Sequence, residues 1–209
     1  MKNYIKLQLI DLVYPIEIKW KGKEMVIRRQ QVPFLARRIA ISLLQSGLVT
    51  FPKQIERARQ EIEELLMEDV EWEQEIEERA YQILEEKEEE QGFAFYSLDR
   101  RELFKLIKRR IAEEEEFPLN LQDRIDELSD YIVRELWEEE LIDYDVVDGK
   151  IRNIIFKTIW EFINRDKRVR ARVHEKLENY KRRLIPGSDE YELMFRKLYE
   201  EELRREGLI

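Results

Sequence analysis

Nine basic residues within a stretch of 19 are the strongest candidates for binding chemistry in this sequence: Arg165, Lys167, Arg168, Arg170, Arg172, Lys176, Lys181, Arg182 and Arg183. Fixed positive charges at this density can follow a phosphate backbone or meet an acidic protein surface. Two other interpretations stay open, because a helix also carries cations on a solvated face and acidic residues elsewhere could neutralise them. We predict that these nine residues, called the basic arc below, bind an anion or a partner.

The remaining candidates for site chemistry favour structural roles. His174 is the only histidine, which excludes multi-histidine metal sites, and Ala171 stands where a Glu-x-x-His di-iron motif needs a glutamate. The glutamate-rich stretches 85–90 and 113–116 point in different directions around a helix, whereas a metal site needs convergent ligands. The absence of cysteine excludes thiolate zinc sites and cysteine nucleophiles. We therefore predict no catalytic residue, no metal and no cofactor, and a protein that is not an enzyme.

Two stretches 93 residues apart share an apolar pattern but differ in charge. Residues 57–90 carry 4 basic and 15 acidic side chains (4 − 15 = −11), whereas residues 150–183 carry 12 basic and 4 acidic ones (12 − 4 = +8). The matching apolar pairs are Leu35/Leu128, Ile39/Ile132, Leu43/Leu136, Leu44/Trp137, Ile62/Ile155, Leu66/Ile159, Val70/Ile163, Ile76/Val169, Ala80/Val173 and Leu84/Leu177. This spacing predicts an internal repeat.

Start and stop signals indicate a mainly α fold of two related multi-helix units in tandem. Pro33 suits a first helical turn, Gly47 a left-handed stop, and Asp99 and Asn120 are N-cap types. We expect the helical stretch 53–90 to break near residues 71–73, and its counterpart near Asn164 and Asp166. We also expect the paired residues to face equivalent cores, with the following side chains buried: Leu44, Met67, Trp137 and Trp160.

Residues 1–29 have a different pattern and predict a small β-hairpin-like N-terminal extension. Ile16, Ile18 and Trp20 alternate with polar residues before the turn at 21–23, as in a strand with one covered face, while 4–13 fits either strand or helix. The predicted domains are therefore 1–29, an extension; 30–117, a first helical unit; and 118–209, a second helical unit.

Several charged helix segments resemble a bacterial family catalogued as domain of unknown function five hundred and seven. These segments begin at Leu35 (LARRI), Ser46 (SGLV), Ile107 (IKRRIAE) and Tyr199 (YEEELRREG). The resemblance covers about residues 28–209 and implies a helical protein. Because the family has no established activity, the resemblance assigns no site residue.

Composition limits the classes of function. Charged residues make up 41% of the 209, hydrophobic residues 43%, and the net charge is −9, which opposes general nucleic-acid affinity. No apolar run reaches a membrane span and no secretory leader is recognisable, so we expect a cytoplasmic protein without membrane contact. The excess of Glu, Lys and Arg is typical of thermophilic proteins. The predicted partner is another protein or its own subunits, with RNA or DNA binding through the basic arc as the alternative.

Overall fold

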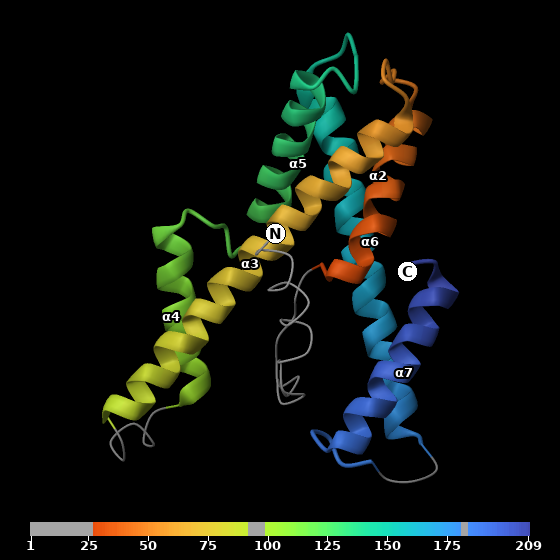
Figure 1. The fold of residues 1–209 in the computed structure, drawn as a ribbon. Coiled ribbons are helices and arrows are strands. Elements are labelled where there is room, and N and C mark those ends of the chain that lie inside the picture. The colour runs from red at the N-terminus through yellow and green to blue at the C-terminus, as the bar shows by residue number, and fades with distance from the viewer. Residues whose placement is uncertain (1–26, 92–98, 181–183) are drawn as a thin grey trace, which may run out of the picture.

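The computed structural model describes residues 27–91, 99–180 and 184–209, and these form a mainly helical protein (Figure 1). A single 3₁₀ turn, η1 (Arg29–Gln31), leads into six α-helices in the described ranges. They are α2 (Val32–Ser46), α3 (Ile55–Gln91), α4 (Arg100–Glu114), α5 (Leu121–Glu138), α6 (Asp148–Glu178) and α7 (Asp189–Glu206). The predicted mainly α class is confirmed, whereas the predicted hairpin falls in residues outside the described ranges.

The helix ends lie where the local sequence places them. Pro33 is in the first turn of α2, and Gly47 ends that helix at φ +67°, a left-handed conformation that costs glycine little. The Asp99 carboxylate accepts a hydrogen bond from the Arg101 amide, and the Asn120 side chain accepts from the two amides that follow residue 121. These side chains satisfy donors that have no partner within the helix, so the predicted caps are confirmed.

The expected breaks in the long helices are wrong. α3 runs without interruption for 37 residues and α6 for 31, through Glu73 and Asp166 respectively. Both carboxylates are buried and accept side-chain hydrogen bonds from other helices. A carboxylate satisfied by a partner has no need to bond its own backbone, so it does not end the helix.

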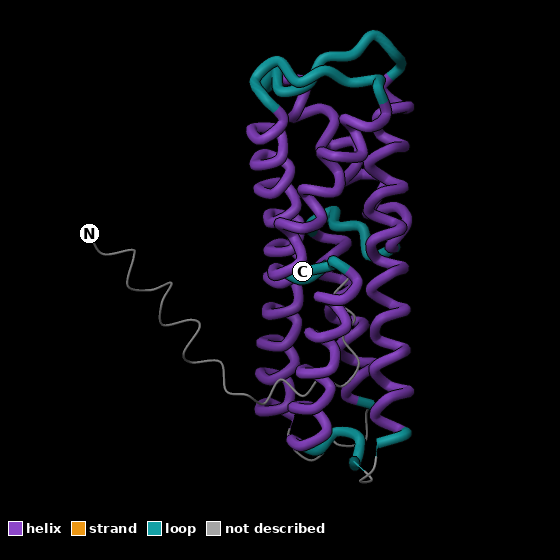
Figure 2. Tube along the Cα trace, turned by 90° about the vertical axis from the view of Figure 1, so that its right-hand side faces the viewer, coloured by secondary structure: helices purple, strands orange, loops and turns teal. Residues whose placement is uncertain are grey.

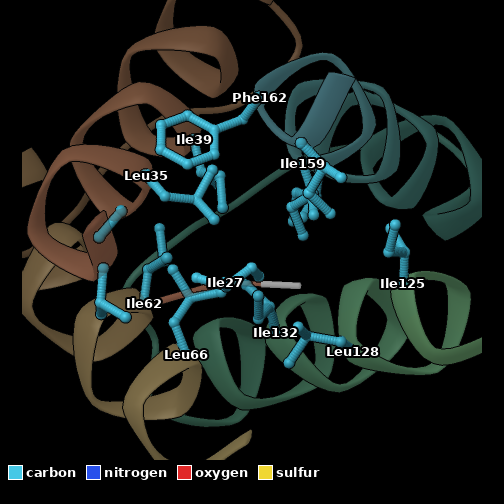
Figure 3. Close-up of a cluster of buried hydrophobic side chains, with 14 of the residues drawn as sticks. Ile27, Leu35, Ile39, Ile62, Leu66, Ile125, Leu128, Ile132, Ile159 and Phe162 are labelled. Atoms are coloured by element: carbon cyan, nitrogen blue, oxygen red, sulfur yellow. The ribbon is translucent and has the colours of Figure 1, made fainter. Parts of the chain in front are cut away.

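Four helical segments form the body of the molecule: α2, α5, and the N-terminal halves of α3 and α6 (Figure 1). Their buried side chains meet in one core, and Figure 3 shows Leu35 and Ile39 of α2 facing Phe162 and Ile159 of α6. Because this core draws on residues before and after 117, the two predicted helical units share it. The division of the chain into domains at 117/118 stays a prediction.

Two legs diverge from the body (Figure 1). The first leg is the C-terminal half of α3 with α4 packed along it, around a separate apolar cluster that includes Ile76 and Phe117. The second leg is the C-terminal half of α6 with α7, whose apolar side chains are continuous with the core of the body. The α2–α3 and α5–α6 loops lie at the opposite end (Figure 2). There Thr50 and Asp143, 93 residues apart in the sequence, exchange backbone hydrogen bonds of 2.9 and 3.0 Å.

The predicted burial of four side chains is wrong. Leu44 is 53% exposed, Trp137 47% and Trp160 37%, while Met67 is half-buried. Leu44 and Trp137 follow the buried Leu43 and Leu136, and one step along a helix turns a side chain away from the core. Aromatic neighbours cover the tryptophans in part, because Trp137 packs on Tyr144 and Trp160 stacks on Phe156.

Candidate interaction surface

Of the six basic-arc residues in the described ranges, three form hydrogen bonds with residues of α7. Arg165 donates to the backbone carbonyl oxygen of Glu206 at 2.9 Å, and Arg172 donates to the Glu206 carboxylate at 2.5 Å. Lys176 donates to Glu202 at 2.7 Å. Hydrogen bonds from Arg172 and Arg165 lower the pKa of Glu206, and a hydrogen bond from Lys176 lowers the pKa of Glu202. These three cations therefore join α6 to α7.

Arg170 belongs to a buried polar cluster at the junction of η1, α6 and α7. Its guanidinium donates to Asp166 at 2.7 Å, and the same carboxylate accepts hydrogen bonds from Gln31, at 2.9 Å, and from the Tyr199 hydroxyl. Burial and the neighbouring Asp166 raise the pKa of Tyr199, although the nearby Arg28 opposes the shift. The hydroxyl therefore stays protonated and acts as a donor to Asp166, so this cluster is structural.

The rest of the arc divides into two groups. Lys167 and Arg168 are exposed, and neither forms an ion pair with another described residue. Lys181, Arg182 and Arg183 lie outside the described residues. The structure thus brings together four of the nine predicted residues, but with acidic partners of the same chain, and the binding role of the arc stays a prediction.

The acidic stretch of α3 is matched by α4 and α5. Arg124, at the start of α5, donates to the two carboxylate oxygens of Asp69 at 2.6 and 3.0 Å and to Glu73 at 2.7 Å. Lys108 of α4 lies 3.2 Å from Glu73 and 2.8 Å from Glu77. Burial alone would raise the pKa of Glu73, but Arg124 and Lys108 outweigh it and hold that pKa below its usual value.

The opposite charges of residues 57–90 and 150–183 predict that the two stretches face one another, either within one chain or between chains, and pairing between chains stays a prediction. No ion pair observed in the described ranges joins α3 to α6. Each long helix is instead matched by its own neighbours, α3 by the cations of α4 and α5, and α6 by the carboxylates of α7. The charge difference between the two stretches therefore reflects two separate packing arrangements.

The outer face of α2 is the most apolar exposed helical face in the body. Phe34, Ile41 and Leu44 are between 38% and 53% exposed, and with Arg37 they follow a helical spacing of three, four and three residues. Leu48, which is 37% exposed, lies just beyond the end of α2 at Gly47. We call these five residues the α2 stripe. It continues into an open groove of about 510 Å³ between α2 and the start of α3, lined by Pro33, Phe34, Arg37, Ala40, Ile41, Ile55, Glu56 and Arg59.

Sequence reasoning missed this stripe although its spacing was visible. The buried face of α2, with Leu35, Ile39 and Leu43, is sufficient to predict the helix without the second apolar face. Leu44 was assigned to the core on the strength of its match with Trp137. A helix with two apolar faces carries more apolar surface than one core requires, and that surplus was the available signal.

The family comparison covers nearly all of the described chain. The model described as "Protein of unknown function (DUF507)" matches residues 25–208. The chain belongs to the DUF507 family. The predicted resemblance is thereby confirmed, and the match begins within the predicted N-terminal extension. A search of curated proteins finds no match to this DUF507 chain.

The other candidates of the DUF507 chain have structural neighbours. His174 is exposed, with its Nδ1 2.9 Å from the Tyr191 hydroxyl and its ring beside Phe195. Glu88 pairs with Arg100, which joins the C-terminal end of α3 to the start of α4. Within the described ranges, no three carboxylate or imidazole groups converge as metal ligands. In the same ranges, no helix has the length and apolar composition to cross a membrane.

Proposed function

We propose that this DUF507 protein is a non-catalytic interaction module, and that the α2 stripe is its docking surface. One observation carries the proposal. Three large apolar side chains stay exposed along one face of α2, and Leu48 beyond its C-cap is a fourth, in a chain in which 41% of residues are charged. Burying such side chains against a partner gains about 25 cal/mol per Å² of apolar surface, so a continuous exposed row is typical of a binding site.

The helix at the equivalent place in the second half supports the proposal. α5 has the positions of the α2 stripe at residues 127, 130, 134, 137 and 141, each 93 later in the sequence. Glu127, Asp130 and Arg134 are exposed there, and Leu141 is buried. The remaining position, Trp137, is the only large apolar side chain that α5 exposes, so a helix in this setting folds with a mainly polar outer face. The apolar stripe of α2 is not something the architecture requires, which favours a role in binding.

We further propose that the chain consists of two related three-helix units, α2–α4 and α5–α7. Most apolar pairs 93 residues apart have equal burial, including Ile62 with Ile155 and Ile76 with Val169. The buried polar contacts also correspond. Gln31 donates to Asp166 and Arg124 donates to Glu73, and both donors and acceptors are 93 residues apart. In each case the start of one unit contacts the long helix of the other unit.

The proposed function is tested by comparing three immobilised forms of the full chain: the wild type, Ile41→Asp, and Arg134→Asp as the matched control on α5. Proteins from an extract of the source cells that bind the wild type and the control, but not Ile41→Asp, are identified and purified. We expect the purified partner to bind Ile41→Asp at least about tenfold more weakly in titration calorimetry. A partner that binds all three forms equally would overturn the proposal.

Nucleic-acid binding is the second candidate, supported by the exposed side chains of Lys167 and Arg168. If these residues contact phosphates, replacing both with glutamate lowers RNA or DNA affinity and reduces the salt dependence by about one unit of slope per contact. We expect no such binding by the wild type at about 0.15 M salt, because the acidic surface of α3 repels phosphates. Salt-sensitive, submicromolar binding would favour this candidate over the first.

A further inference from the structure

We propose that the partner which docks on the α2 stripe is an amphipathic helix of another protein, with acidic side chains flanking its apolar face. This inference rests on the proposed function and assigns the chemical class of the partner. It follows from the spacing of the stripe, from the charges at its edges, and from the absence of a matching helix in the described part of this chain.

The spacing of the stripe fits a helix. Positions that alternate three and four residues apart form one row along an α-helix, which is the seam used when two helices pack side by side. Within α2, Phe34, Ile41 and Leu44 are the apolar members of that row. α2 has 15 residues and is therefore about 22 Å long at 1.5 Å per residue. Four turns of a partner helix cover that length. The groove beside Phe34 and Ile41 adds a recess for one of its large side chains.

The charges at the stripe favour acidic flanking residues. α2 contains Arg37 and Arg38 but no acidic residue, although the chain has 47 in total. Arg37 is exposed within the stripe and forms no ion pair among the described residues. Arg38 lies on the side toward α6, where partial burial and the nearby Arg165 lower its pKa. Carboxylates of a docked helix would relieve this crowding of cations and would pair with Arg37.

A second copy of the chain fits the stripe less well. Two α2 stripes packed together would bring the two Arg37 side chains to one interface with no carboxylate from either helix. α5 has the acidic side chains but exposes only Trp137 as a large apolar group. α4 and α7 each expose one leucine, Leu106 and Leu193. Among the described helices none combines an acidic face with a row of exposed apolar side chains, which favours a helix of another protein as the partner.

The test uses the full chain and two labelled synthetic helices of about 18 residues, a length that covers the stripe. Both carry leucine at alternating three- and four-residue spacing. One has glutamate at the flanking positions, and the other has lysine at the same positions. Fluorescence anisotropy measures their affinities for the wild type, for Arg37→Glu/Arg38→Glu, for Ile41→Asp, and for Arg134→Glu as the control on α5. Circular dichroism checks that every variant keeps its helical content.

We expect the wild type and the control to prefer the glutamate peptide by about tenfold at low salt, with the preference shrinking as salt rises. The Arg37→Glu/Arg38→Glu variant should reverse the preference, and Ile41→Asp should bind neither peptide. Equal binding of both peptides by the wild type, lost in Ile41→Asp, would overturn the acidic partner while leaving the proposed docking surface intact. Binding of neither peptide would overturn the inference. So would a wild-type dimer in sedimentation that Ile41→Asp dissociates, because a second copy would then occupy the stripe.

Discussion

The two junctions between the halves of the molecule use different chemistry at corresponding positions. At the first junction Arg124 donates to Glu73 and Asp69, and Lys108 also contacts Glu73. At the second junction the neutral amide of Gln31 donates to Asp166, which also accepts from Arg170 and Tyr199. The geometry is shared, but the charge is not. One packing arrangement thus tolerates either solution, provided that every buried polar group has a partner.

The same contrast holds for the outer faces of α2 and α5. In the proposed repeat these two helices correspond, and α2 exposes Phe34 and Ile41 where α5, 93 residues later, exposes Glu127 and Arg134. Because both helices bury a row of apolar side chains in the same core, the core does not account for the difference between their outer faces. Interior positions are fixed by packing, and the outer positions are free to acquire a function.

The largest effect on stability is expected from substitutions at the two junctions, and its size should differ between them. Arg124→Ala leaves Asp69 and Glu73 buried without their main cation, and removal of one member of a buried ion pair costs about 3–5 kcal/mol of unfolding free energy. Gln31→Ala removes one neutral donor from Asp166, which keeps Arg170 and Tyr199, and costs about 1–2 kcal/mol. Urea unfolding of the two variants measures the difference. Equal losses would show that the charge of the first junction is energetically unimportant.

Lowering the pH tests the contribution of the first junction to stability, because the pKa of Glu73 is held below its usual value in the folded state. The folded state therefore binds this proton more weakly than the unfolded state. The resulting stability is present above the unfolded pKa, and is lost as the pH falls from there through the lower, folded pKa. We expect Glu73→Gln to have a smaller loss of unfolding free energy than the wild type between pH 5 and pH 3, measured by urea titration at each pH. Parallel curves for the two proteins would contradict this assignment.

Many local features were predictable from the sequence because they depend on neighbouring residues. Pro33, Gly47, Asp99 and Asn120 act within one turn of where they stand, so the helix boundaries they mark were correct. The continuity of α3 and α6 was not predictable in this way. It depends on Arg124 and Gln31, which reach Glu73 and Asp166 across 51 and 135 residues.

The candidate site was harder to predict than the fold. Three cations of the basic arc, Arg165, Arg172 and Lys176, have partners on α7 that only the tertiary structure identifies. The α2 stripe was hidden for a different reason, because apolar periodicity alone does not distinguish a face that meets a core from one that meets a partner.

A smaller effect on stability is expected from the residues with positive φ that follow the C-terminal ends of α2 and α5. The corresponding residues Gly47 and Glu140 both have positive φ, +67° and +52°. A left-handed conformation costs a residue with a side chain about 1–2 kcal/mol relative to glycine, offset in part by the greater entropy of glycine in the unfolded chain. We expect Glu140→Gly to raise the unfolding free energy by up to about 1 kcal/mol, and Gly47→Ala to lower it by a similar amount. Thermal unfolding measures both, and a loss of stability in Glu140→Gly would contradict the comparison.

The most direct test of the account gives α2 the outer face of α5. Phe34→Glu/Ile41→Arg introduces the residue types found 93 positions later, on side chains that are 39% and 38% exposed. We predict that the unfolding free energy of this double variant stays within about 1 kcal/mol of the wild type, as for surface substitutions, while its affinity for the glutamate-flanked peptide falls at least about tenfold. A loss of several kcal/mol would contradict the account, because the stripe would then stabilise the fold. Unchanged peptide binding would contradict it equally.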